Sequence, residues 1–552
     1  MPDDLALIRF PELVVGIAGP IGVDIETICA TTQEALRAVD YGSTIIKITD
    51  EIDELPSSFK KPRGKNFHGL MKFKMDHASD LCRTRDDPAF LMRVAIAAIR
   101  RERDSLAENG KSLSEVFKNE VAGDESFGPP NPFAFDLIGA TDRVAQSEAY
   151  IIRQLKRPEE VTLLRRVYGR QFILISAYGS ETDRREVLEE KIRRTTPLNT
   201  SENTITYKAQ ELIDKDADEG GDVCGQHLRD TFHLADVFID GINKNEMSIT
   251  LTRFFNALFG LNSITPSKKE YGMYCAKSAS LRSSDLSRQV GAAIFSKDGE
   301  IIVQGCNEVP KANGGTYWDC EQPDFRDISL GSDPNEDEKR EVVRDVLERL
   351  ERAEILKLPA QAKRDLDSLI DHLTSNKKDQ NDKSMGALKG SKILDLTEYG
   401  RVVHAEMCAI CDAARLGKSL KGGILYCTTF PCHNCAKHIL ASGIKSVVFM
   451  EPYPKSKAKI LHKNEIEVDG YSSDRISFVP FLGISPYRYR DIFEKREKRK
   501  SGSLAKKWYY DVPCPMIDVL APSYTELERH VVRPIASDAV QGILPLETDP
   551  EE

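Results

Sequence analysis

Two short motifs, His-Ala-Glu and Pro-Cys-His-Asn-Cys, each stand at the start of a predicted helix, with one predicted strand over 423–429 between them. They place His404, Cys432 and Cys435 where two helix starts can meet at one end of that strand. One imidazole and two thiolates fill three of the four positions of a tetrahedral zinc ion and leave one position for water. The spacing therefore requires both helix starts to converge, and it predicts one catalytic Zn2+ per chain.

A structural zinc site normally has a fourth protein ligand, and His433, Cys408 and Cys411 are the candidates near this motif. His433 lies between the two cysteines of the second motif. Cys408 and Cys411 lie one and two turns further along the helix that His404 begins, where a core position is favoured. These placements favour an open, catalytic site.

Glu406 stands two residues after the predicted histidine ligand. At this position a carboxylate can lie beside a zinc-bound water without binding the metal, take a proton from that water and pass it to a ring nitrogen. The combined pattern H-x-E…P-C-x-x-C is typical of zinc deaminases, in which hydroxide attacks C4 of cytosine and ammonia leaves. We therefore predict that Glu406 is the catalytic acid and base.

The surrounding sequence resembles the deoxycytidylate deaminase family. The stretch CTTFPCHNCAKHILASGIKSVVFMEPYPKS is similar to the core of that family, and SRQVGAAIFSKDGEIIVQGCNEVP is similar to its first two strands, with KDG as a hairpin turn. The resemblance covers residues 265–489 apart from a charged insertion. It implies that His404, Cys432 and Cys435 are zinc ligands and that Glu406 is the proton shuttle.

The same resemblance implies three substrate-binding residues. Asn307 matches an asparagine that contacts the nucleoside, Arg288 stands where a basic residue faces the nucleotide phosphate, and Tyr453 matches a substrate-side aromatic residue. A guanidinium group can bind phosphate through two hydrogen bonds, which suits a nucleotide better than a free nucleoside. The alternatives are that Arg288 is an ordinary surface arginine and that Asn307 only shapes the turn after its strand.

The N-terminal half carries the sequence GIAGPIGVDIE over residues 16–26, directly after an apolar run. Against the phosphate-binding pattern G-x-x-x-x-G-K-[ST], Asp24, Ile25 and Glu26 stand where glycine, lysine and a hydroxyl residue belong. We therefore expect no phosphoryl transfer. Backbone N–H groups around Gly19 and Gly22 could still bind the anionic part of a nucleotide at the helix start. The alternative is that this domain serves packing or holds an inhibitor.

Strand-like and helix-like runs alternate as far as Thr196, which predicts βαβ units and a parallel sheet. The predicted fold class is α/β, with a P-loop kinase-like parallel-sheet domain followed by a cytidine deaminase-like αβα domain. The predicted segments are a degenerate P-loop domain over 1–200, a connecting helical region over 201–264, a zinc domain over 265–490 with an insertion at about 321–394, and a tail over 491–552.

This layout as a whole resembles the bacterial anti-phage dCTP/dCMP deaminases. The resemblance implies depletion of the deoxycytidine nucleotide pool during infection, and it implies restraint by an inhibitor, which in some relatives is a small noncoding RNA. Free deoxycytidine nucleotides are the expected partners, with dCTP, dCMP or both as substrates. We also expect a homo-oligomer.

Composition narrows the class of protein. The 552 residues carry a net charge of −10, no apolar run approaches the roughly 20 residues of a membrane span, and the N-terminus lacks a secretory pattern. These features favour a cytoplasmic protein with no membrane partner, and scattered cysteines favour reduced thiols. Two alternatives stay open: a deaminase that edits RNA or DNA, against which the acidic balance argues, and a nucleotide-sensing regulatory protein with a structural zinc site.

Overall fold

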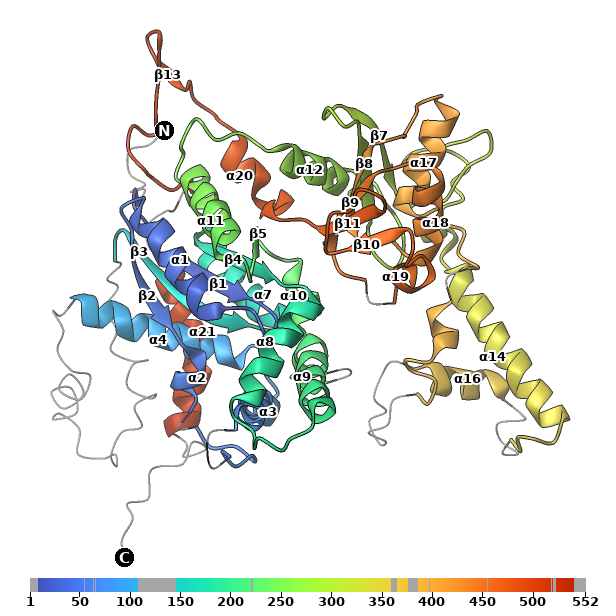
Figure 1. Cartoon of the computed structure of the whole chain (residues 1–552), viewed down its shortest axis with the longest axis horizontal. Helices are drawn as coiled ribbons and strands as arrows, with labels where there is room; N and C mark the ends of the chain where they lie inside the picture. Colours follow the sequence, from blue (N-terminus) through green and yellow to red (C-terminus); the bar gives the residue numbers. More distant parts are fainter. Residues whose placement is uncertain are drawn as a thin grey trace, which may run out of the picture. The chain divides into compact units, whose positions relative to one another are not determined.

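The computed structural model divides the chain into two compact units, Met1–Glu270 with Leu482–Glu552, and Tyr271–Phe481 (Figure 1). It describes residues 8–540 except 54, 63, 65, 108–144, 220–221, 359–364, 376–385, 397, 454, 518 and 520–522. Parts of the predicted insertion (359–364 and 376–385) and of the predicted tail (541–552) therefore lie outside the described residues.

The first unit is built on a six-stranded sheet with the order β12-β5-β4-β1-β3-β2. Its strands are β1 (Leu13–Ala18), β2 (Gly42–Ile46), β3 (Glu148–Leu155), β4 (Phe172–Tyr178), β5 (Val237–Asp240) and β12 (Gly483–Ile484). The first five run parallel, and β12 pairs antiparallel with β5. Every residue of β1 is buried, as expected for the central strand of a parallel sheet with helices on both faces. The α/β class predicted for this half is confirmed.

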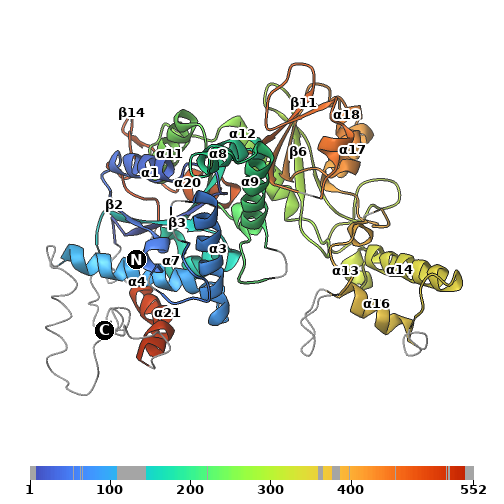
Figure 2. The same ribbon diagram turned by 60° about the horizontal axis from the view of Figure 1, so that its bottom comes forward.

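Helices cover both faces of this sheet. In Figures 1 and 2, α1 and α11 lie together on one side, and α4, α7 and α21 lie together on the other. The helices of this unit are α1 (Ile25–Arg37), α2 (Ile48–Glu51), α3 (Phe67–Thr84), α4 (Phe90–Ala107), α7 (Pro158–Tyr168), α8 (Glu181–Arg193), α9 (Glu202–Ala217), α10 (Leu228–Phe232), α11 (Lys244–Leu258), α20 (Tyr489–Phe493) and α21 (Ser523–Val540). Short 3-10 turns η2 (Gly169–Gln171) and η4 (Pro486–Arg488) and a small hairpin of β13 (Lys500–Ser501) and β14 (Leu504–Ala505) complete it.

The C-terminal part of the chain returns to this first unit. Arg488, which is buried, donates from Nε to Asp236 Oδ1 at 3.0 Å. Further on, the buried carboxylate of Glu528 in α21 pairs with Arg103 Nη1 at 2.8 Å, and Arg103 Nε pairs with Glu12 at 2.7 Å. A buried charge is costly unless it is paired and hydrogen-bonded, so this network fixes α21 against α4 and the start of β1.

The second unit contains a six-stranded mixed sheet with the order β10-β11-β9-β8-β6-β7. Its strands are β6 (Gly291–Phe295), β7 (Ile301–Cys306), β8 (Ile424–Thr429), β9 (Ser446–Glu451), β10 (Ile466–Val468) and β11 (Ile476–Pro480). Its helices are α12 (Lys268–Ser280), whose first residues belong to the first unit, α13 (Asp327–Leu330), α14 (Pro334–Arg352), α16 (Leu366–Thr374), α17 (Ala405–Arg415), α18 (His433–Ala441) and α19 (Ala458–Leu461), with a 3-10 turn η3 (Lys392–Asp395).

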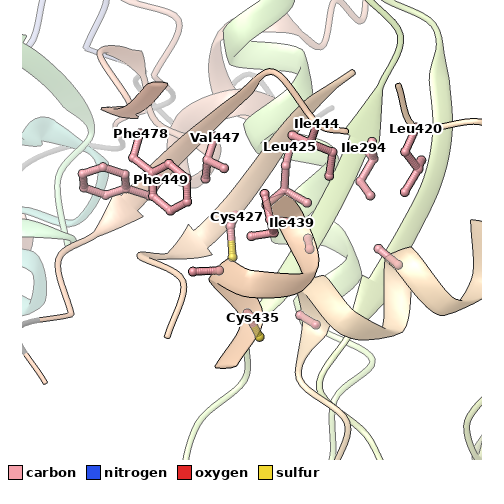
Figure 3. Close-up of a cluster of buried hydrophobic side chains, with 14 of the residues drawn as sticks. Ile294, Leu420, Leu425, Cys427, Cys435, Ile439, Ile444, Val447, Phe449 and Phe478 are labelled. Carbon is pink, nitrogen blue, oxygen red and sulfur yellow. The ribbon is translucent and has the colours of Figure 1, made fainter. Parts of the chain in front are cut away.

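The core of the second unit lies between this sheet and the helices α17 and α18. Figure 3 shows Leu425, Val447 and Phe449 from the strands close to Ile439 from α18. Strands β6 and β7 form the antiparallel hairpin, with Gly299 at φ +104° in its turn, where a residue with a side chain would be strained. Figures 1 and 2 show α14 and α16, which belong to the inserted segment, side by side and apart from the sheet.

Among the helices that the structure describes, none combines the length and the apolar character that crossing a bilayer requires.

Candidate active site

Two helix starts carry the metal-ligating side chains. His404 is the N-cap residue of α17, and Cys432 is the N-cap residue of α18, where its sulfur accepts from the N–H of Cys435. Helix α17 packs closely on β7 because Gly305 has no side chain: a Cβ there would stand 2.4 Å from the carbonyl oxygen of Ala405. This close packing sets the position of His404 relative to the sheet.

His404, Cys432 and Cys435 offer three ligand atoms that all lie within 4.8 Å of one another. The sulfur atoms of Cys432 and Cys435 lie 3.3 Å and 3.4 Å from Nδ1 of His404. Tetrahedral zinc with ordinary Zn–S and Zn–N bonds requires a sulfur-to-nitrogen separation of about 3.5 Å. The donor set and its spacing therefore fit zinc, as predicted from the motif.

Hydrogen bonds couple the protonation of the three ligands. Hydrogen bonds from the Cys435 thiol and from His404 lower the pKa of Cys432 to about 4, and the bond to Cys432 raises the pKa of His404 to about 9. Bonding to the Cys432 thiolate, together with burial, raises the pKa of Cys435 well above its usual range. Cys432 is thus the thiolate, the form in which cysteine binds metal, and zinc binding would release the protons that these shifts favour on His404 and Cys435.

Glu406 lies beside the cluster in the first turn of α17. Only 4% of its surface is exposed, and its Oε2 accepts from the sulfur of Cys435 at 3.4 Å. Burial raises the pKa of this carboxyl group, while the positive charge of His404 opposes the shift. A carboxyl group with a raised pKa, placed next to a metal cluster, is suited to accept and then release a proton.

A cavity of about 500 Å3 opens onto the cluster. Its lining includes His404, Glu406 and Cys432, and it also includes the three predicted substrate residues Arg288, Asn307 and Tyr453. The structure therefore brings these predicted residues of the zinc domain around one space, within the usual range for a small-molecule site.

Arg288 and Tyr453 lie close together at this cavity. The guanidinium carbon of Arg288 is 5.7 Å from the centre of the Tyr453 ring, and Nη1 of Arg288 is 3.2 Å from Oε2 of Glu451. About half of the Arg288 side chain is exposed, so the guanidinium group is accessible to a ligand.

The side chain of Asn307 contacts backbone on both sides. Its Oδ1 accepts from the N–H of Val290 at 2.7 Å, and its Nδ2 donates to the carbonyl of Arg288 at 2.8 Å. These bonds hold the segment that carries Arg288 against the end of β7. A contact between Asn307 and substrate stays a prediction.

The alternative ligands lie outside the metal cluster. Cys408 is buried and Cys411 is exposed, and neither belongs to the group within 4.8 Å. His433 lines the cavity, and its buried Nδ1 has no hydrogen-bond partner in the part of the chain that the structure describes.

The cavity also contains several charged residues that the sequence motifs did not predict. Lys392 and Asp395 come from the end of the insertion, and Lys455 and Lys457 follow β9. Nζ of Lys455 lies 2.5 Å from Oδ1 of Asp395, so an ion pair joins the two segments. The sequence signal for Lys455 and Lys457 is the run PKSKAK shortly after β9. The contribution of the insertion depends on the tertiary fold.

Gly19 and Gly22 lie in the other unit, in the loop between β1 and α1. Gly22 has φ +102°, and a Cβ there would stand 2.7 Å from the Cβ of Arg184. The N–H of Ile21 donates to Oδ2 of Asp216 at 2.7 Å, and the N–H of Asp24 donates to the carbonyl of Gly241 at 3.1 Å. Protein groups therefore accept from two N–H groups of this loop; nucleotide binding by the loop stays a prediction.

One family model matches a segment that includes much of the second unit. A family described as "Cytidine and deoxycytidylate deaminase zinc-binding region" matches residues 266–451. This segment is therefore deoxycytidylate deaminase-like, and its family is a zinc-binding one.

Curated relatives match over shorter stretches. The chain is 48% identical to the deoxycytidylate deaminase of Enterobacteria phage T4 over 69 residues, 12% of this chain and 36% of that protein. It is 44% identical to the human deoxycytidylate deaminase over 54 residues, 10% of this chain and 29% of that protein. It is 42% identical to ComE operon protein 2 of Bacillus subtilis over 53 residues, 10% of this chain and 28% of that protein. The chain thus spans about a third of the length of these relatives.

A solved dCMP deaminase from the cyanophage S-TIM5, in complex with dCMP and dUMP, is 18% identical. The similarity covers 39% of this chain and 98% of that one, with a TM-score of 0.21, which is too low to support an argument.

Proposed function

We propose that this chain removes the amino group of cytosine from free deoxycytidine nucleotides by hydrolysis. The observation that carries the proposal is the convergence of His404, Cys432 and Cys435 beside the buried carboxyl group of Glu406, in a cavity that Arg288 also lines. The deoxycytidylate deaminase-like character of residues 266–451 supports the same reaction.

His404, Cys432 and Cys435 would hold the zinc ion. When bound, zinc supplies Lewis acidity and lowers the pKa of water to about 7. Glu406 takes a proton from the attacking water on its buried carboxylate and delivers it to the ring nitrogen beside C4. A second proton passes through Glu406 to the amino group, so that water adds to C4 and ammonia leaves. The burial of Glu406 excludes bulk water from these transfers.

The substrates are nucleotides. Arg288 is a half-exposed guanidinium group at the cavity, and a phosphate can replace its partly buried partner Glu451, because phosphate offers a stronger charge-assisted contact. Tyr453 lies next to Arg288 and supplies an aromatic surface for the nucleoside. Both dCMP and dCTP fit this description, and Lys455 and Lys457 add positive charge on the same cavity.

The biological role that we propose is depletion of the dCTP pool as an anti-phage defence in the cytoplasm. The support is the resemblance of the whole layout, in which an α/β unit with a degenerate phosphate loop precedes a deaminase-like unit. An inhibitor, such as a small noncoding RNA, would restrain the enzyme before infection, and the chain would act as a homo-oligomer.

The test is to incubate the purified, zinc-loaded chain separately with dCMP, dCTP, deoxycytidine and a cytosine-containing single-stranded DNA. Formation of dUMP or dUTP with an equal amount of ammonia is expected, with little turnover of the nucleoside or the DNA. Deamination of DNA alone would identify an editing enzyme. No product from any substrate at full zinc occupancy would indicate a structural metal site.

A further inference from the structure

A second cavity, of about 210 Å3, lies wholly in the first unit. Its lining includes Ile21, Lys47 and Lys156, which lie just after the carboxyl ends of β1, β2 and β3, respectively. In open parallel sheets, ligands bind in the crevice outside the carboxyl ends of the strands. The cavity thus has the position of a ligand site and is separate from the zinc cluster.

The loop that contains Gly19 and Gly22 already holds an anion of the chain itself. The buried carboxylate of Asp216 accepts from the N–H of Ile21 at 2.7 Å and pairs with Nζ of Lys156 at 2.6 Å. Lys156 also donates to the carbonyl of Gly19 at 2.7 Å. An external phosphate in this loop would have to displace a buried carboxylate, which favours the other side of the same cavity for a ligand.

Three cations of the cavity stay accessible. Two other cations of the lining are neutralised by buried carboxylates. Arg157 pairs with Glu160 at 2.9 Å, and Lys156 pairs with Asp216 at 2.6 Å. Lys47 and Lys74, by contrast, form no ion pair with any residue that the structure describes. The third accessible cation, Arg153, lies 2.8 Å from Glu26 of α1. The side chain of Glu26 is 72% exposed, and an exposed partner of this kind is easily exchanged for a ligand anion.

The backbone is distorted at the same place. Gly16 pairs with Ile152 and Ala18 pairs with Leu155, so Arg153 and Gln154 of β3 together oppose the single residue Ile17 of β1. Gln154 has φ +63°, an unfavourable conformation for a residue with a side chain. Such a bulge redirects side chains, and here it lies where Arg153 and Gln154 line the cavity.

The remaining wall is apolar. Ile48 and Ile52 from the α2 segment line the cavity together with Met71 and Met75 from α3. Flexible methionine side chains adapt well to a flat ring. The volume is below the roughly 300 Å3 at which drug-sized ligands are usually enclosed, which favours a single phosphate with one ring over a triphosphate chain.

We propose that this cavity binds a nucleoside monophosphate, with the phosphate held by Lys47, Lys74 and Arg153 and the base against the apolar wall. The site would let the first unit sense nucleotides without transferring phosphate. It does not depend on the deaminase activity proposed above.

The experiment is isothermal titration of the full chain with AMP, GMP, CMP, UMP and inorganic phosphate. At least one monophosphate is expected to bind more tightly than inorganic phosphate and than its own triphosphate. Lys74→Met and Lys47→Ala should each weaken that binding by about tenfold or more, the loss typical of one charge-assisted phosphate contact. Lys74→Met retains the aliphatic bulk of the side chain, and unchanged melting temperatures would show that both variants are folded.

Lys72→Ala is the matched control, because Lys72 lies on the same helix but pairs with Glu211 at 2.6 Å outside the cavity. This variant should bind as the wild type does. For AMP and GMP, which lack cytosine, Arg288→Ala should also leave the binding unchanged, which distinguishes this site from the cavity of the zinc domain. Absence of monophosphate binding, binding no tighter than that of inorganic phosphate, or binding lost in Arg288→Ala but kept in Lys74→Met would each overturn the proposal.

Discussion

Replacing Arg288 with alanine tests how the cavity of the zinc domain selects a phosphorylated substrate. A charge-assisted hydrogen bond contributes about 1.5–3 kcal/mol. Arg288 is about half exposed and must first leave Glu451, a partly exposed pair that contributes about 0–1 kcal/mol. The net loss should therefore be about 0.5–3 kcal/mol, or roughly 2- to 150-fold in kcat/KM for dCMP.

The assay compares kcat/KM for dCMP with kcat/KM for deoxycytidine, measured by release of ammonia. Because the nucleoside has no phosphate, its turnover should change little in Arg288→Ala. Glu451→Gln removes the competing carboxylate and should raise kcat/KM for dCMP. Arg415→Ala is the matched control, since Arg415 is a half-exposed arginine that pairs with Asp412 at 2.9 Å away from the cavity. Equal losses on nucleotide and nucleoside would refute the assignment of Arg288 to the phosphate.

Three further predictions concern the metal site and its support. Burial raises the pKa of Glu406 above its ordinary value, and a base must be deprotonated to act. Activity should therefore fall as the pH decreases through this raised pKa, and an acidic limb of kcat/KM at or below the ordinary range of a glutamate carboxyl group would contradict this. Cys435→Ser should lower the zinc content, measured by mass spectrometry, to well below one ion per chain. It should also lower the melting temperature, because metal binding stabilises the folded state. Full zinc occupancy in this variant would contradict the proposed set of ligands. Gly305→Ala should lower the free energy of unfolding by about 1–3 kcal/mol in denaturant titration, because the new Cβ would collide with α17. Gly470→Ala is the control and should not destabilise the protein, because a Cβ at that position makes only ordinary contacts. Equal stability of the two variants would contradict the close packing of α17 on β7.

The order of strands could not be read from the sequence, although their presence could. Alternating apolar and helical runs predict parallel βαβ units, because each strand is buried on both faces and each crossover is long. The two-residue strand β12 (Gly483–Ile484) carries no periodic signal, and its partner β5 lies more than two hundred residues away. The return of Ser523–Val540 to the first unit depends equally on distant partners such as Arg103.

The metal cluster was accessible to sequence reasoning because its geometry is local. His404 and Cys432 each cap a helix that follows a recognisable motif, and Cys435 lies one turn beyond Cys432. The wall that contains Lys392 and Lys455 was not accessible, since it depends on how the end of a long insertion packs beside the loop after β9.

Glu406 is central to the proposed reaction, and one measurement tests its role. Zinc-loaded wild-type protein and the Glu406→Ala variant would each be given dCMP, and dUMP, ammonia and bound zinc would be quantified in the same samples. We predict one zinc per chain in both proteins, equal amounts of dUMP and ammonia from the wild type, and a loss of activity of about a hundredfold or more in the variant. Undiminished deamination by a fully zinc-loaded Glu406→Ala protein would contradict the account.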